Sequence, residues 1–227
     1  MPYSRRVFRR LVQLYAGLVL YGVSMAFMVR SGLGLDPWDV LHQGVSRQVG
    51  LSLGTVTILV GALVLLLWVP LRQRPGFGTV SNVVVIGLVV DVVLHRLPAA
   101  GAWWSQTGLM VAGVLLNGVA TAAYIGARLG PGPRDGLMTG LVRRCGRSVR
   151  LVRTSIEVSV LATGWLLGGT VGVGTVAYAF GIGPIVHVLL PRLTVPVPDP
   201  PIRPLSPPGD TASATAPAPP LPSPTPR

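Results

Sequence analysis

The segment GLGLDPWDVLHQG, residues 32–44, separates two long apolar runs with two aspartates, a proline, a tryptophan and a histidine. A related segment, GPGPRDGLMTG, occupies residues 130–140, and the sequence around both segments repeats at an offset of 96 residues. When residues 11–97 are aligned with residues 107–193, 30 of the 87 positions are identical. The chain therefore contains an internal duplication.

The composition of the 227-residue chain is that of a membrane protein. Half of it is hydrophobic, only 11% is charged, and the mean hydropathy is +0.61. A spanning helix needs about 20 apolar residues. Six runs approach or reach that length: residues 11–29, 52–71, 79–97, 108–127, 154–169 and 175–193. The sequence predicts an all-α polytopic membrane protein with six transmembrane helices.

The duplication divides these helices equally. Residues 11–97 form the first three-helix repeat and residues 107–193 the second. Because three is odd, the second repeat enters the membrane from the opposite side, which predicts a 3+3 inverted repeat. Residues 1–10 are expected to form a basic cytoplasmic N-terminus. Residues 194–227 are expected to be a disordered Pro-rich cytoplasmic tail, because their composition buries too little apolar surface to fold.

The charge distribution indicates an orientation. All 19 basic residues are arginines and the net charge is +12. Nucleic acid is excluded as a partner because the charge accompanies spanning runs. Only Arg30, Arg47 and Arg96 fall on one side of the six spans, and the other connections carry the rest. By the positive-inside rule, both termini are expected in the cytoplasm.

The polar segment of the first repeat predicts a short helix that begins at Pro37. Proline suits the first helical turn, and Asp36 before it can cap the free N–H groups there. Apolar and polar residues then alternate with helical spacing. The apolar stripe is Trp38, Leu41, Val45 and Val49, and the polar side is Asp39, Gln43 and Arg47. We expect a short amphipathic helix in each repeat, lying at the interface or re-entering the membrane.

Asp39 and Asp135 occupy equivalent positions in the two polar segments. In an inverted fold they are expected on opposite faces, as parts of two gates or of a polar lining that binds a solute or ion. Asp36 and Trp38 are candidates for the same site. The alternative is a capping turn that was duplicated with the rest of the repeat. That alternative is favoured for Asp36, which has Gly132 as its counterpart.

Ionisable residues inside the spans are further candidates. Asp91 and His187 are equivalent positions, and they could support proton coupling, or Asp91 could form a local pair with His95. Glu157 is one helical turn from Arg153, which predicts a structural ion pair.

Other polar and small residues have structural explanations. Asn82 and Asn117 are expected to form hydrogen bonds between helices, and Gly164, Gly168 and Gly172 to permit close packing. No metal-ligand cluster, phosphate loop or nucleophile motif is present. We therefore expect no catalytic residues, no metal and no cofactor, and hence no enzyme.

Three motifs of the first repeat carry a family resemblance. They are the segment at residues 32–44, a G-x-S-x-G at residues 50–54 and a P-G-x-G-T at residues 75–79. With them, residues 10–193 resemble the YczE/YyaS/YitT family of bacterial integral membrane proteins. The second repeat departs from the pattern, with Arg134 replacing the tryptophan of the first. The resemblance implies this fold and a location in the plasma membrane of a bacterial cell, but it implies no substrate.

Movement of a small solute or ion of unknown identity is the leading functional interpretation. The alternative is an accessory or regulatory membrane protein that transports nothing. The expected partners are the lipid bilayer and the solute, and self-association into a homo-oligomer is left open.

Overall fold

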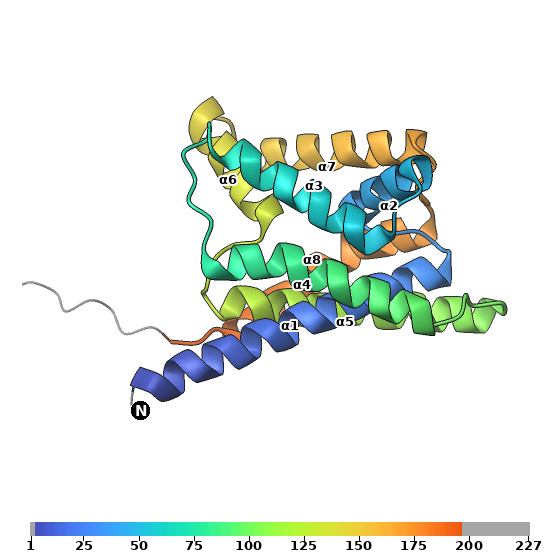
Figure 1. The fold of residues 1–227 in the computed structure, drawn as a ribbon, viewed down its shortest axis with the longest axis horizontal. Coiled ribbons are helices and arrows are strands. Elements are labelled where there is room, and N and C mark those ends of the chain that lie inside the picture. Colours follow the sequence, from blue (N-terminus) through green and yellow to red (C-terminus); the bar gives the residue numbers. More distant parts are fainter. Residues whose placement is uncertain (1–2, 197–227) are drawn as a thin grey trace, which may run out of the picture. The chain divides into compact units, whose positions relative to one another are not determined.

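Eight α-helices form the part of the chain that the computed structural model describes, residues 3–196 (Figure 1). Each half of the chain contributes a long helix, a short helix and two further helices, in that order. The helices are α1 (Tyr3–Ser31), α2 (Pro37–Val49), α3 (Leu53–Trp68), α4 (Phe77–Arg96), α5 (Trp103–Gly126), α6 (Pro133–Cys145), α7 (Val149–Leu166) and α8 (Val173–Leu193). No strand occurs between residues 3 and 196, so the all-α prediction is confirmed for this part of the chain.

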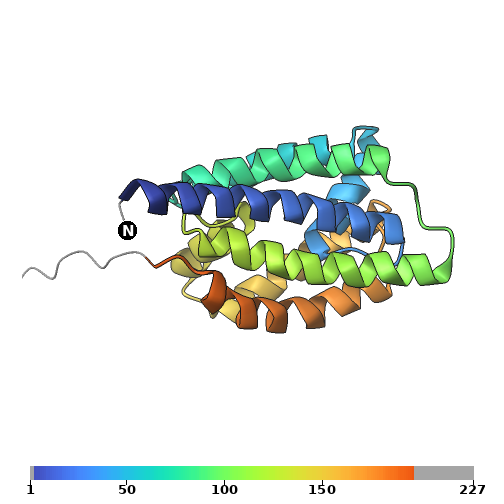
Figure 2. The same ribbon diagram turned by 90° about the horizontal axis from the view of Figure 1, so that it is seen from below.

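The helices lie in two layers. In one layer α4, α1, α5 and α8 lie side by side in that order (Figure 2). The other layer holds α2, α3, α6 and α7 (Figure 1). Within it α2 packs on α7 and α3 packs on α6, so both contacts join the two halves of the chain.

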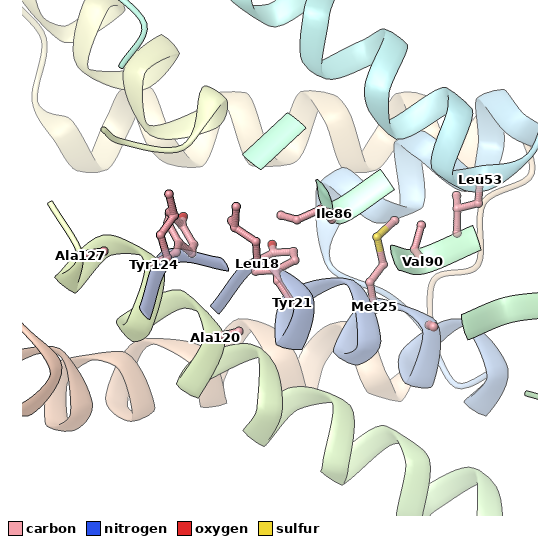
Figure 3. Close-up of a cluster of buried hydrophobic side chains, with 11 residues drawn as sticks. Leu18, Tyr21, Met25, Leu53, Ile86, Val90, Ala120, Tyr124 and Ala127 are labelled. Carbon is pink, nitrogen blue, oxygen red and sulfur yellow. The ribbon is translucent and has the colours of Figure 1, made fainter. Parts of the chain in front are cut away.

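The largest buried cluster forms where α1 packs between α4 and α5 (Figure 3). Leu18 and Met25 of α1 are fully buried there against side chains such as Val90. The outer surfaces of the helices are also apolar, and they expose large side chains such as Leu88 and Phe180. Continuous exposed apolar surface marks contact with a partner or a membrane, and here it fits helices surrounded by lipid.

Four helices are long and apolar enough to cross a membrane: α1 from Val7 onward, α4, α5 and α8. The count rises to five if α2 and α3, which meet at a bend of 114°, form one broken span. Alone, α3 has only 16 residues, fewer than the about 20 that a straight span needs. The chain is thus an α-helical membrane protein that crosses the bilayer several times. The six-span 3+3 arrangement stays a prediction.

The two short helices begin at prolines, as the sequence predicts. Each starts at a proline and ends at a glycine in the left-handed region, with φ of 71° at Gly50 and 63° at Gly146. The prediction for their faces was incomplete, because Asp39 and Gln43 of α2 are buried whereas Val49 is 56% exposed. Polar groups at membrane depth need partners inside the protein, so α2 turns much of its polar side inward.

Two equivalent backbone hydrogen bonds join the halves, one donated by each half to the other. The N–H of Gly78 donates to the carbonyl of Leu129 at 2.9 Å, and the N–H of Gly174 donates to the carbonyl of Leu33 at 2.7 Å. These two pairs are equivalent in the 96-residue repeat. Each bond fastens the start of the last helix of one half to the loop after the first helix of the other half.

The beginning of α1 meets the ends of α5 and α8. Gln13 donates hydrogen bonds to the carbonyls of Ala123 and Leu193, at 2.9 and 2.6 Å. The predicted disordered tail, residues 194–227, lies almost wholly outside the described residues. Val195 is an exception, because it is buried and its N–H bonds to the last residue of α5.

Candidate functional site

The first turns of α2 and α6 are joined by one arginine. Arg134, at the start of α6, places Nη1 3.3 Å from Asp36 Oδ1 and Nη2 3.0 Å from Asp39 Oδ1. Both carboxylates are buried, whereas the Arg134 side chain is 28% exposed. A buried carboxylate is costly unless it is paired, so Arg134 allows both aspartates to lie at this depth.

The local structure explains why this arginine reaches across. Asp36 caps α2 by accepting hydrogen bonds from the N–H groups of Trp38 and Asp39, at 2.8 and 2.9 Å. The equivalent residue before α6 is Gly132, which offers no side-chain cap. The Arg134 guanidinium lies 5.2 Å from the centre of the Trp38 ring, close enough for a cation–π contact. Trp38 and Arg134 are equivalent positions of the repeat, and they meet each other.

His42 extends this group of charges. Its Nδ1 lies 3.3 Å from Asp39 Oδ1. The side chain is only 3% exposed, and Nδ1 has no hydrogen-bond partner among the described residues. A buried polar atom without a hydrogen bond costs free energy, and the group that faces this nitrogen is the Asp39 carboxylate.

A cavity of about 450 Å³ adjoins these residues. Its lining includes Asp36, Trp38, His42, Arg134 and Asp135, together with the three tyrosines Tyr21, Tyr124 and Tyr178. This volume is typical of small-molecule sites, which combine apolar walls with a few polar groups. The arrangement can therefore hold a small polar molecule between the two halves.

The cavity extends toward the end of the bundle at which α8 ends. Ile125, near the end of α5, and His187 and Leu190, near the end of α8, all line it. On this side α7 and α8 do not pack along each other, whereas the corresponding helices α3 and α4 do.

At the other end, α2 closes against α7 and the loop after it. The side-chain oxygen of Gln43 accepts a hydrogen bond from the N–H of Thr170 at 2.7 Å. Arg47 donates to the carbonyl of Gly168 and to the Thr170 hydroxyl, and Gln48 donates to the carbonyl of Leu167. The two ends of the site thus differ, one being sealed by hydrogen bonds and the other being hollow.

The candidate residues of the two polar segments converge here. Arg134 joins Asp36 and Asp39, while Asp135, the next residue, lines the cavity and accepts a hydrogen bond from the Tyr124 hydroxyl at 3.3 Å. Asp39 and Asp135 thus both lie beside Arg134, and their assignment to opposite faces of the membrane stays a prediction. The short helices turn back into the bundle, so their first turns meet.

Asp91 lies apart from this site. Its carboxylate accepts hydrogen bonds from Ser52 Oγ and, at 2.7 Å, from the N–H of Gly54, so it holds the start of α3. It does not line the cavity, whereas its equivalent His187 does. The structure thus does not place these two candidates in one proton path, and Asp91 bonds to α3 rather than to His95.

The structural roles expected for other residues are largely confirmed. Arg153 and Glu157 form an ion pair of 2.9 Å, and both line the cavity. Asn117 donates to Ser24 at 3.0 Å and accepts from Tyr178 at 3.2 Å, which links three helices.

Gly164, Gly168, Gly172 and Asn82 have different surroundings in the structure. Gly164 and Gly172 allow close approach, to α2 and to the loop before it respectively, but Gly168 has open space around it and instead supplies a φ of 93°. Asn82 is buried and lines the cavity.

Arg134 is the residue that the sequence reasoning missed. It was counted with the cytoplasmic arginines, because positively charged loops indicate orientation. A signal was present, since the second polar segment differs from the first by an arginine in place of a tryptophan. A charge that replaces an aromatic residue in a membrane-depth motif needs a buried partner, and Asp36 and Asp39 were the available acids. Between residues 3 and 196, no group of three or more His, Cys, Asp and Glu residues could hold a metal ion.

Comparisons with known proteins identify relatives of the whole bundle. A model for a family of unknown function, DUF6198, matches residues 8–191. A Haemophilus influenzae protein named only as uncharacterized is 42% identical over 173 residues, 76% of this chain and 79% of its own length. The Bacillus subtilis protein named uncharacterized membrane protein YczE is 34% identical, covering 78% and 84%. YyaS of the same organism, named an uncharacterized protein, is 24% identical, covering 77% and 89%. No solved structure matches the chain.

Proposed function

We propose that this chain, which belongs to the DUF6198 family and is similar to YczE and YyaS, moves a small solute or ion across the membrane through the cavity between its halves. The observation that carries the proposal is the cavity of about 450 Å³ with charged side chains at the meeting point of α2 and α6. Charged groups at membrane depth are costly. A bundle that served only as a scaffold could be packed dry.

The exchanged hydrogen bonds support an inverted repeat as the basis of this function. The bonds from Gly78 to Leu129 and from Gly174 to Leu33 are related by the exchange of the two halves. In secondary transporters with inverted repeats, the solute site lies at the interface of the repeats, at the ends of broken helices. We infer that α3 and α7 complete six crossings and that α2 and α6 are re-entrant helices.

The charge distribution supports an orientation in the bacterial plasma membrane. Both termini are cytoplasmic in this proposal, and the hollow end of the cavity then faces the cytoplasm. Single cysteines in place of Arg47 and Trp104 test it, in a chain whose exposed Cys145 is changed to serine. An impermeant thiol reagent applied outside intact cells should label both. Labelling of either site only after the cells are opened would contradict the orientation.

Transport itself is tested by a screen of solutes with the purified full chain in proteoliposomes. Gly183 lines the cavity, and a Cβ there meets no atom within 4 Å. Gly183→Trp should therefore fill the cavity without disrupting the fold, and uptake of any transported solute should stop. Gly108→Trp is the matched control, since Gly108 also has open space but does not line the cavity.

If no solute in a broad screen enters the vesicles while the protein is folded, the accessory or regulatory function is favoured instead. Equal uptake by the Gly183→Trp and Gly108→Trp variants would instead show that the solute takes another path.

A further inference from the structure

We propose that the cavity binds an organic monocation, an amine or a quaternary ammonium compound, at the carboxylate of Asp135. This inference rests on the proposed function, because it names the class of solute that the same cavity takes.

The pairing of charges around the cavity singles out Asp135. Arg134 is engaged by Asp36 and Asp39, and Arg153 by Glu157. Asp135 lines the cavity with no ion-pair partner in the described part of the chain, and its carboxylate accepts a hydrogen bond from the Tyr124 hydroxyl at 3.3 Å. A cationic ligand would give it the partner that it lacks.

The balance of acidic and basic groups at the site also favours a cationic ligand. Four carboxylates and two guanidinium groups lie at the site. The N-termini of α2 and α6 add about half a positive charge each. The four carboxylates still outnumber the two guanidinium groups and the helix N-termini together, although the whole chain carries +12. An anionic solute would therefore meet no free positive group, because both guanidinium groups are already paired.

The walls of the cavity favour an organic cation over a metal ion. Tyr21, Tyr124 and Tyr178 line it, and aromatic faces attract ammonium groups. The site already contains one such contact, in which Arg134 lies 5.2 Å from the centre of the Trp38 ring. Between residues 3 and 196 no cluster of side chains could hold a metal ion.

The test measures thermal unfolding of the purified full chain in detergent with increasing concentrations of tetramethylammonium, choline and tetraethylammonium. A ligand that binds only the folded state raises the Tm in a saturable way. At least one of these probes should do so. Dimethylbutanol, the neutral carbon isostere of choline, should have no effect, because it has the same shape without the charge.

Two variants assign the effect to Asp135. Asp135→Asn keeps the size of the side chain, and it should weaken binding of the probe by at least about tenfold, as expected for loss of a charge partner. Asp91→Asn is the matched control: its carboxylate is bound to the start of α3 and does not line the cavity, so binding should be unchanged even if the Tm falls.

The inference is overturned if no ammonium probe raises the Tm, if the isostere binds equally well, or if Asp135→Asn binds as tightly as the unchanged chain. These results are independent of the transport screen. Ammonium binding without uptake contradicts the proposed function alone, whereas uptake of a neutral or anionic solute without ammonium binding contradicts only the inference.

Discussion

The short helices α2 and α6 have the same place in the repeat, but they pack on the opposite half in different ways. α2 lies directly on α7, because a Cβ on Gly164 would overlap the backbone of Val40 and Leu41. α6 is held away from α3 by Trp68, whose ring occupies the space that a Cβ on Gly136 would need. Gly164 and Trp68 are equivalent in the 96-residue repeat, and so are Val40 and Gly136. At the α2–α7 contact the short helix carries the larger residue, Val40, and its neighbour carries the glycine. At the α6–α3 contact the short helix carries the glycine and its neighbour carries the larger residue, Trp68.

This exchange accompanies the difference between the two ends of the bundle. Where glycine faces valine, two helix backbones approach closely and hydrogen bonds seal the end of the cavity. Where tryptophan faces glycine, the indole spaces the helices, and its Nε1 donates to the carbonyl of Pro133 at 3.1 Å. The closer contact thus lies at the end that hydrogen bonds seal, and the wider contact lies at the hollow end.

The largest effect is expected from the charge that joins the two short helices. Arg134→Gln leaves Asp36 and Asp39 buried without a cation, and breaking a buried pair costs about 3–5 kcal/mol. Arg153→Gln breaks an ion pair whose side chains are 60% and 41% exposed, so it should cost at most about 1 kcal/mol. Thermal unfolding in detergent compares the two variants, and equal losses would mean that Arg134 does not stabilise the aspartates.

Exchanging the side-chain sizes of the wider contact tests the comparison directly. Trp68 is 1% exposed, and Trp68→Ala should lower stability by about 3–5 kcal/mol because it leaves a hole. Gly136→Val should also destabilise the fold, because the new side chain meets the indole. The double variant should lose less than the sum of the two, by at least about 1 kcal/mol, because the valine then occupies the vacated space. Unfolding temperatures of the two single variants and the double variant test this prediction. If the two losses simply add, the valine does not fill the space that the indole vacates.

A smaller effect is expected when the tight contact is loosened by one methyl group. Gly164→Ala places that methyl against the backbone of α2, and overpacking of this kind costs about 1–3 kcal/mol. Gly108→Ala is the control, since a Cβ there meets no atom, and alanine in a helix is more stable than glycine by about 0.5–1 kcal/mol. The unfolding temperature should therefore fall in the first variant and not in the second.

The smallest effects concern the helix caps that follow the short helices. Ser52 caps α3 and Ser148 caps α7, each by accepting a hydrogen bond from a backbone N–H in the first turn. Ser148→Ala should cost about 1 kcal/mol. Ser52→Ala should cost more, because Asp91 also loses a hydrogen-bond donor. A larger loss for Ser148→Ala, measured under the same conditions, would contradict the role given to Asp91.

Structural features that depend on residues close together in the sequence could be predicted from it. The helical class, the starts of both short helices at prolines and the cap at Asp36 follow from signals within a few residues. The family resemblance is confirmed by the relatives, because it rests on motifs that can be read locally. The number of crossings could not be settled in this way, because α3 is short and α7 carries Arg150, Arg153 and Glu157 within it.

The sequence by itself determined that this is a helical membrane protein built from two related halves, since hydropathy, caps and repeats are properties of the chain read in order. Only the tertiary structure decided that Arg134 pairs with Asp36 and Asp39, 98 and 95 residues away. It also decided that Asp91 holds the start of α3 and that Gly136 makes room for Trp68. A buried charge requires some partner and a glycine permits some close neighbour, but which residue fills that place depends on how the helices pack in three dimensions.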